Sequence, residues 1–247
     1  MKIVVIGGQG LIGSKVVVKL CDWGHDVITA SRRSGVDVLT GAGLAEALAG
    51  ADAVVDVADS PSFDDDAVRN FFTTATANIL AAEQKLGVTH HLALSVLGSR
   101  RMPDSGYNSA KRAQEELIEE SGRPFTIVQA TPFYEFGILL ADSATYGEVV
   151  RLPPAAFRPI AADDVATAVA GAAVGPPVNG TIEIAGPEAM GMDDFARKAL
   201  VAARDQRVVI TDADAPYFGA RIDDHTLAPS ENATIYSTPY TDWLLAR

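Results

Sequence analysis

The chain has 247 residues, of which 48% are hydrophobic and 21% charged, and its formal net charge is −12. This length suits one α/β domain with a small appendage, and the composition is that of a folded globular protein. The acidic balance, without any cluster of Lys and Arg, argues against a nucleic-acid partner. Cys21 is the single cysteine, which excludes an intrachain disulfide and a cysteine-rich metal site.

The chain begins directly with the strand-like KIVVIGG, and no apolar run approaches the roughly 20 residues that a membrane span needs. We therefore expect a soluble, cytoplasmic protein with no membrane partner. The adjacent His90 and His91 have no carboxylate or cysteine at ligand spacing, so we expect no bound metal.

Short β-branched runs alternate with segments of helical period in the first half of the chain, which is the pattern of βαβ units. The predicted strands are 2–6, 26–30, 53–57, 91–95 and 125–130, and the predicted helices are about 11–23, 65–86 and 109–121. Asp64 to Asp66 are expected to cap the second helix. Because the strands are apolar along their whole length, we predict an α/β fold with a doubly wound parallel sheet of Rossmann type.

The alternation loosens after Pro132, where glycines and a Pro-Pro pair predict irregular connections and a small C-terminal substrate lobe. Helices near 163–173 and 193–204, strands at 181–185 and 207–211, and an amphipathic segment around Trp243 follow. Asp163 and Asp164 are expected to cap the first of these helices. We divide the chain into a dinucleotide-binding core, 1–132, and a mixed segment, 133–247, that returns elements to the core and forms the lobe.

A glycine-rich turn joins the first predicted strand to the first helix. Gly7 permits a tight turn, Gly10 lets the backbone approach a pyrophosphate, and Gly13 lets the helix pack close to the strand. The helix N-terminus then presents unpaired N–H groups to the phosphates. The pattern predicts a dinucleotide site that includes Gly7, Gln9, Gly10, Leu11, Ile12 and Gly13.

The second strand ends at Ser31-Arg32-Arg33, where an NAD-preferring site would place an acid to bind the ribose 2′-hydroxyl. Two guanidinium groups and a hydroxyl suit a 2′-phosphate instead, since Arg binds phosphate through two charge-assisted hydrogen bonds. NADP(H) is therefore the predicted cofactor.

Tyr107 and Lys111 lie four residues apart at a helix start, hence on one face, and Ser95 precedes the tyrosine by twelve residues. Carbonyl reduction needs a proton donor beside the hydride donor. A neighbouring ammonium lowers the pKa of a phenol, and a hydroxyl can hydrogen-bond the carbonyl oxygen as charge develops. We predict Tyr107 as the acid, Lys111 as its tuner and a ribose ligand, and Ser95 as the polariser.

These motifs together resemble the short-chain dehydrogenase/reductase superfamily, and within it the atypical NmrA-like, NAD(P)H-binding branch. Similar stretches are SGYNSAKRAQEELIEESGRPFTIVQATPF (105–133), RPIAADDVATAVA (158–170) and TPYTDWL (238–244). The resemblance implies that Asp37 and Val38 border the adenine, that Val57, Ala58 and Asp59 border its ribose, and that Thr131, Pro132 and Phe133 border the nicotinamide. It also implies that Phe72 or a neighbour replaces the asparagine of the family's proton relay, with Asn78 a separate packing position.

Three functions remain open at this point. The first is an NADPH-dependent reductase of a small, fairly apolar carbonyl compound or quinone. The second is a non-catalytic NADP(H) sensor of NmrA type that docks to a protein, and the third is a nucleotide-sugar epimerase or dehydratase, which would need a larger lobe. The aromatic residues Phe133, Phe136, Tyr217 and Phe218 fit either a pocket wall or the core, and the oligomeric state is open.

Overall fold

The computed structural model describes residues 1–246 and is built around a seven-stranded sheet in the order β12-β9-β5-β4-β3-β1-β2. All neighbouring strands in it pair in parallel. The strands are β1 (Lys2–Ile6), β2 (Asp26–Ala30), β3 (Ala53–Asp56), β4 (His90–Val96), β5 (Phe125–Ala130), β9 (Gly180–Ala185) and β12 (Thr234–Ile235). The predicted α/β fold with a parallel sheet is confirmed.

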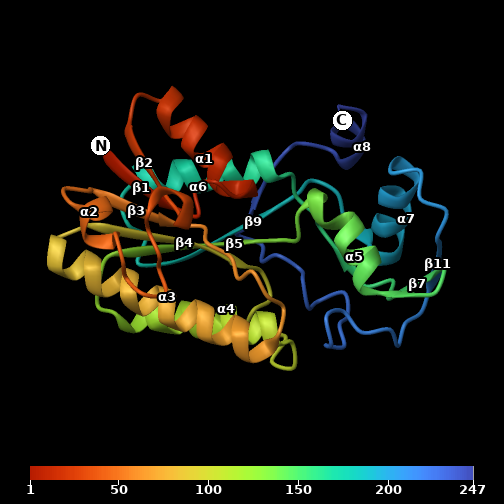
Figure 1. The fold of residues 1–247 in the computed structure, drawn as a ribbon. Helices are drawn as coiled ribbons and strands as arrows, with labels where there is room; N and C mark the ends of the chain where they lie inside the picture. Colours follow the sequence, from red (N-terminus) through yellow and green to blue (C-terminus); the bar gives the residue numbers. More distant parts are fainter. Residues whose placement is uncertain (247) are drawn as a thin grey trace.

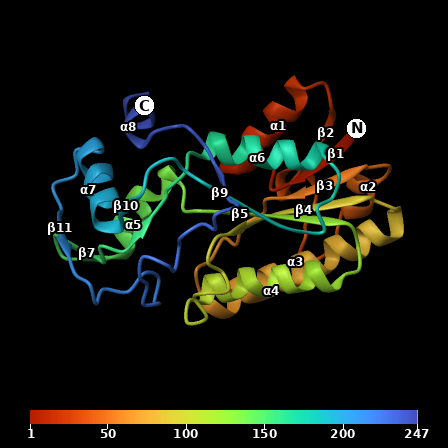
Figure 2. The ribbon, with the colours of Figure 1, turned by 180° about the vertical axis from the view of Figure 1, so that it is seen from behind.

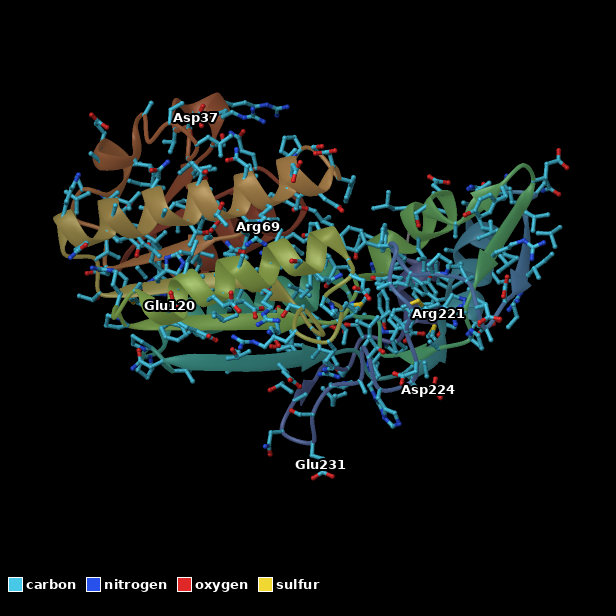
Figure 3. The ribbon with its side chains drawn as sticks, turned by 90° about the horizontal axis from the view of Figure 1, so that it is seen from below. Asp37, Arg69, Glu120, Arg221, Asp224 and Glu231 are labelled. Carbon is cyan, nitrogen blue, oxygen red and sulfur yellow. The ribbon has the colours of Figure 1, made fainter. Side chains whose placement is uncertain are left out.

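Helices cover both faces of this sheet (Figure 1). On one face α1 (Leu11–Asp22) packs against α6 (Ala162–Val174), and on the other α3 (Asp65–Leu86) packs against α4 (Gly106–Glu120) and α2 (Leu44–Leu48). Figure 3 shows α3 and α4 side by side, with Arg69 on the first and Glu120 at the end of the second. Within residues 1–246, no helix is both long and apolar enough to cross a membrane.

The chain runs from β1 outward to β2 and then returns to β3 on the other side of β1. The connections after β1 and β3 therefore leave the sheet in different directions. In open parallel sheets of this kind, ligands bind in the crevice beyond the carboxyl ends of the strands at such a reversal. The central strands can be buried on both faces because they are rich in Val and Ile, and those of β1 and β3 are fully buried.

A lobe lies at one end of the sheet, as Figure 2 shows from behind. It contains α5 (Gly137–Ser143), α7 (Met192–Ala202), α8 (Tyr240–Leu245), a sheet of β6 (Thr145–Tyr146), β7 (Val149–Leu152) and β11 (Val208–Thr211), and a pair of β8 (Ala156–Phe157) and β10 (Met190–Gly191). Tyr134, Phe195 and Tyr240 form its aromatic centre, with ring centroids 4.8–4.9 Å apart. Three segments from beyond Phe133, namely α6, β9 and β12, return to the main sheet.

Two local expectations need correction. The stretch after Pro132 holds the regular elements α5, β6 and β7, which are short and pack only against the lobe, so periodicity in the sequence does not reveal them. The side chains of Asp163 and Asp164 do not cap α6; instead the Ala162 N–H donates to Glu135 Oε2 at 3.2 Å. Asp163 is held away by Lys15, whose Nζ lies 3.0 Å from its Oδ2. The predicted cap at Asp64 is confirmed, with Ala67 N donating to it at 3.1 Å.

Glu83 on α3 and His91 on β4 form a buried ion pair, with His91 Nδ1 2.7 Å from Glu83 Oε1. The guanidinium of Arg123 lies 3.6 Å from the other carboxylate oxygen. Burial acts to lower the pKa of His91, but the charge and hydrogen bond of Glu83 outweigh it, and the pKa is raised. The pair therefore ties α3 to the sheet on the side opposite α1.

Glu83→Gln should lower the free energy of unfolding by about 3 kcal/mol at mildly acidic pH, because it leaves buried His91 and half-buried Arg123 without their carboxylate. A histidine with a raised folded pKa stabilises fully below its unfolded value of about 6.5, and that stabilisation is lost as pH rises through the folded value. The difference between wild type and variant in urea unfolding should therefore shrink as pH rises above about 6.5. Glu119→Gln, at the exposed partner of Arg100, is the control. If the difference in unfolding free energy between wild type and Glu83→Gln does not change with pH, the ion pair of His91 with Glu83 is contradicted.

Candidate cofactor and substrate site

A cavity of about 500 Å³ lies beyond the carboxyl ends of β1, β3, β4 and β5 and extends to the lobe. Its core side is lined by the glycine-rich turn, the loops after β2 and β3, the end of β4 and the first turns of α4. Its other side is lined by residues between Phe133 and Leu227. The cavity thus brings the predicted cofactor residues and the lobe to one place.

The glycine-rich turn is sterically tight at Gly7, Gly8 and Gly13 and less crowded at Gly10. Gly7 has φ +77°, and a Cβ there would lie 2.7 Å from Val57 O. A Cβ on Gly13 would lie 2.2 Å from Gly7 O, so α1 approaches β1 only because this position is glycine. A Cβ on Gly10 would meet only Gly7 O at 3.3 Å. A side chain at Gly10 would need only a small shift of the Gly7 carbonyl, and the bare backbone there leaves room for a phosphate.

Helix α1 begins at Leu11 beside this opening, with Gly10 as its N-cap. No side chain within residues 1–246 caps it. The N–H groups of the first turn and the positive end of the helix dipole therefore face the cavity, where Gln9, Leu11 and Ile12 also lie. An uncapped helix N-terminus of this kind binds anions, and it fits the pyrophosphate of a dinucleotide.

The loop after β2 places two of its three predicted residues on the cavity. Ser31 Oγ donates to Gln9 Oε1 at 3.0 Å, which links this loop to the glycine-rich turn. Arg32 lines the cavity and is exposed, whereas Arg33 is exposed without lining it. Neither guanidinium has a carboxylate within ion-pair distance among the described residues. Arg32 is thus a free cation at the end of β2.

The next loop is held in place by an asparagine of α3. Asn78 Nδ2 donates to Val38 O at 2.8 Å and to Leu39 O at 3.0 Å, while Asp37 Oδ1 accepts from Leu39 N at 2.8 Å. Asp37 and Val38 line the cavity, and Figure 3 shows Asp37 far from Arg221 of the lobe. The expected packing role of Asn78 is therefore specific, because it fixes the loop predicted to border the adenine.

Residues from the ends of β3 and β5 line the middle of the cavity: Val57, Ala58, Asp59, Thr131, Pro132 and Phe133. Thr131 Oγ1 donates to Arg158 O at 2.5 Å, and the ring of Phe133 stacks on Phe136 with centroids 5.0 Å apart. The structure brings all of these predicted contacts to the same cavity as Gly10.

Tyr107 lies at the start of α4, where its hydroxyl donates to Asp59 Oδ1 at 3.1 Å. Its ring meets Phe72 edge-on with centroids 5.8 Å apart. The pKa of Tyr107 is raised well above its ordinary value, first by burial and then by the charge and hydrogen bond of Asp59. The expected lowering of this pKa by Lys111 is wrong for the structure as it stands, because Asp59 is the charge that the phenol contacts.

Lys111 lies one turn further along α4 and is only 3% exposed. Its Nζ donates to Leu94 O at 2.8 Å and to Gln114 Oε1, and it lies 4.3 Å from the centre of the Phe72 ring. Burial lowers the pKa of Lys111, while neighbouring carboxylates, with Asp56 foremost, act to raise it. Phe72 of α3 thus contacts both the Tyr107 ring and the Lys111 ammonium.

Ser95 at the end of β4 lines the cavity, but its proton is engaged. Its Oγ donates to Glu115 Oε1 at 2.5 Å. The buried Glu115 also accepts from Ser99 at 3.1 Å and from Gln129 at 2.8 Å. Glu115 and Gln114 are not among the predicted site residues, although both lie three to four residues after Lys111, the spacing that places side chains on one helix face.

The lobe lines its part of the cavity with apolar and aromatic side chains. They are Phe133, Phe136, Leu139, Leu140, Phe157, Met192, Phe195, Tyr217, Phe218 and Leu227, with no cation among these lining residues of the described chain. Phe136 and Phe218 are 38% and 39% exposed, so they form the rim of the cavity rather than the core. The four aromatic residues singled out in the sequence all lie on the cavity wall.

Residues 7–176 match the family described as NAD(P)H-binding. The chain belongs to this family. The match starts at the glycine-rich turn and ends after α6, so the family region contains the whole core side of the cavity. The chain is therefore an NAD(P)H-binding protein, which confirms the dinucleotide cofactor.

A curated relative, the photosystem II assembly factor Ycf39 of Synechocystis, is 23% identical over 176 residues, which are 64% of this chain and 54% of the relative. The chain thus matches about half the length of that relative. Among solved structures, MoeE5 in complex with UDP-glucuronic acid and NAD has a TM-score of 0.79 at 17% identity and covers 100% of this chain and 97% of its own. The quinone oxidoreductase QOR2 of Escherichia coli with NADPH has a TM-score of 0.74 at 17% identity and covers 99% of both chains. These similarities show a shared Rossmann-type fold over the full length.

Two glycine substitutions should separate ligand binding from folding. Gly10→Ala should weaken NAD(P)H binding by about tenfold or more with little change in Tm, because its Cβ enters the phosphate opening. Gly13→Ala should lower Tm by several degrees, since its Cβ would overlap Gly7 O and force α1 away from β1. NADPH fluorescence titration and thermal unfolding measure the two effects. Unchanged binding in Gly10→Ala would show that the phosphates lie elsewhere.

Proposed function

We propose that the protein is an NADPH-dependent reductase of a small, uncharged carbonyl compound or quinone, with Tyr107 as proton donor. One observation carries the proposal: Tyr107 and Lys111 line the same cavity as the glycine-rich turn, and the lobe lines that cavity with apolar and aromatic, uncharged side chains. A phenol beside a buried ammonium is suited to proton transfer, and an apolar wall excludes water from the reacting atoms.

In this mechanism bound NADPH supplies a hydride to the carbonyl carbon or quinone ring. The Tyr107 hydroxyl turns from Asp59 to the substrate oxygen and gives up its proton as negative charge develops there. Lys111 stabilises the resulting phenolate by its charge. Ser95 offers a second hydrogen bond to the same oxygen when its proton turns from Glu115, and Phe133 and Phe136 flank the substrate.

The substrate class follows from the charge of the lobe. A nucleotide sugar carries a diphosphate, which proteins bind with Arg, Lys or a helix N-terminus. The lobe side of the cavity presents no Arg or Lys among its described lining residues, whereas stacked Phe133 and Phe136 offer flat apolar surface for an aromatic ring. This supports a quinone-like acceptor over the nucleotide sugars of an epimerase, and QOR2 is similar in fold.

The second candidate function is a sensor of NADP(H) that docks to a protein and catalyses nothing. Two points favour it: the resemblance implies that Phe72 or a neighbour replaces the relay asparagine, and burial, followed by Asp59, raises the pKa of Tyr107. A sensor does not explain why the Tyr107 phenol stands one helical turn from Lys111, because binding the cofactor needs no proton donor.

We also place the chain in the atypical NmrA-like branch of the short-chain dehydrogenases/reductases, and in the cytoplasm. The motifs from Ser105 to Phe133 and the Phe72 substitution support the branch. The division at residue 132 fits the same proposal, since the predicted cofactor residues other than Phe133 lie within 1–132 and every lobe residue on the cavity follows it.

Tyr107→Phe should reduce turnover by about 10²- to 10⁴-fold while NADPH binding stays nearly unchanged, because only the proton donor is lost. Oxidation of NADPH is followed by its absorbance over a panel of quinones, aldehydes and ketones, with a UDP-sugar included. Turnover with the uncharged acceptors and none with the UDP-sugar is the expected pattern. Tight NADPH binding without turnover by the wild type on any acceptor would favour the sensor, and equal activity of the variant would rule out Tyr107 as the acid.

Arg32→Ala should weaken NADPH binding by about ten- to a hundredfold and NADH binding much less, because a charged hydrogen-bonded pair with the 2′-phosphate is lost. Arg33→Ala is the comparison, and we expect a smaller effect since Arg33 does not line the cavity. The two dissociation constants are measured for each variant by fluorescence. A parallel loss for both cofactors would contradict the 2′-phosphate assignment.

A further inference from the structure

The three N–H bonds of the Lys111 ammonium are divided between the protein interior and the cavity. Two of them are used internally, on Leu94 O and on Gln114 Oε1. An ammonium has three donors and no acceptor, so one donor is left for the cavity that Lys111 lines. A neutral amine would have only two, and the interior contacts would use both. The protonation state of Lys111 therefore decides whether it offers the cavity a donor or a lone pair.

Gln114 connects Lys111 to a second buried charge. Its Oε1 accepts from Lys111 while its Nε2 donates to Asp56 Oδ2 at 3.0 Å. Gln114 and Asp56 are each 2% exposed. The amide can serve both partners only in this orientation, because an ammonium has nothing to accept with and a carboxylate nothing to donate. The two charges thus fix the amide, and the amide fixes the position of Nζ.

The other oxygen of Asp56 holds the loop that faces the cofactor. Asp56 Oδ1 accepts from Ala58 N at 3.1 Å, and Ala58 precedes Asp59, the hydrogen-bond partner of Tyr107. One carboxylate therefore anchors both Lys111, through Gln114, and the backbone next to the residue that Tyr107 contacts. Asp56 ends β3 at the centre of the sheet, so this anchor is rigid.

We propose that Asp56 and Gln114 are positioning residues for Lys111: the Asp56 carboxylate keeps the buried lysine protonated, and Gln114 directs its third N–H into the cavity. This inference rests on the proposed function of the site for its effect on turnover. Both supporting side chains are buried, so they hold the lysine from within the protein.

The charges around this group are few. Asp56, Asp59 and Glu115 act on Lys111 and favour its charged form, against burial. Asp56 itself has its pKa raised by burial, and His91 and Lys111 act in the opposite direction, while Glu83 adds to the increase. Of the carboxylates that face Lys111, Asp56 alone is hydrogen-bonded to the side chain that Nζ contacts.

The test is the titration of Lys111 itself, followed by NMR in the full chain with ¹³C-labelled lysine and assigned by its absence from Lys111→Met. In Asp56→Asn the midpoint should move to lower pH by about one unit, because an opposite charge is removed beside the ammonium. The alkaline limb of NADPH turnover should move in the same direction. In Gln114→Met, which keeps the carboxylate but removes the acceptor, we expect turnover to fall by about tenfold and the titration to shift less.

Asp193→Asn is the matched control, since Asp193 is a buried carboxylate of α7 that contacts Thr211 and Arg197 rather than Lys111. In Asp193→Asn, the midpoint of the Lys111 titration should equal that of wild type. An unshifted midpoint in Asp56→Asn would overturn the proposal, and if that variant does not fold, unchanged turnover in Gln114→Met would overturn it as well. If the wild type has no turnover, the reductase fails but the NMR midpoint still decides whether Asp56 keeps Lys111 charged.

Discussion

The close approach of α1 to β1 is the constraint on which the rest of the site depends. Gly13 lies so near the Gly7 carbonyl that any side chain would separate helix and strand. Helix α1 starts at Leu11, and no side chain of the described residues caps it. Its first N–H groups therefore face the crevice where the sheet order reverses. The close packing of α1 on β1 thus also places an anion site at the start of the helix. The cavity extends from this site toward β4, β5 and the lobe.

The two sides of the cavity differ in chemistry because they come from different parts of the chain. The core side is built from strand ends and helix starts, so backbone N–H groups and polar side chains such as those of Asp59 and Tyr107 face the cavity. The lobe side is built from α5, α7 and loops. Some of their aromatic residues pack in the lobe's own core, and some of these also line the cavity. A polar cofactor and an apolar substrate can therefore share one cavity without competing for the same surface.

Sequence patterns predict the core better than the lobe for a physical reason. Strands β1, β3, β4 and β5 are largely buried and read as continuous apolar runs, and α3 is long and capped at Asp64, so these elements leave a clear pattern in the sequence. Elements such as β6 and β8 have two residues and depend on tertiary contacts. In the site, spacing in the sequence predicts the glycine-rich turn and the pair Tyr107 and Lys111. It does not predict the hydrogen bonds of Ser95 with Glu115 or of Asp56 with Gln114, because these partners lie 20 and 58 positions apart and no local period relates them.

Burial has opposite effects on the two titratable groups of the proposed proton transfer. It raises the pKa of Tyr107 and lowers that of Lys111, so each group alone resists becoming charged. The same low polarity strengthens the attraction between a phenolate and an ammonium once both exist. Loss of the Tyr107 proton is therefore easiest when Lys111 is already charged. Asp56 is buried and does not line the cavity. Its carboxylate can therefore favour the charged form of Lys111 without taking up the proton that Tyr107 gives to the substrate.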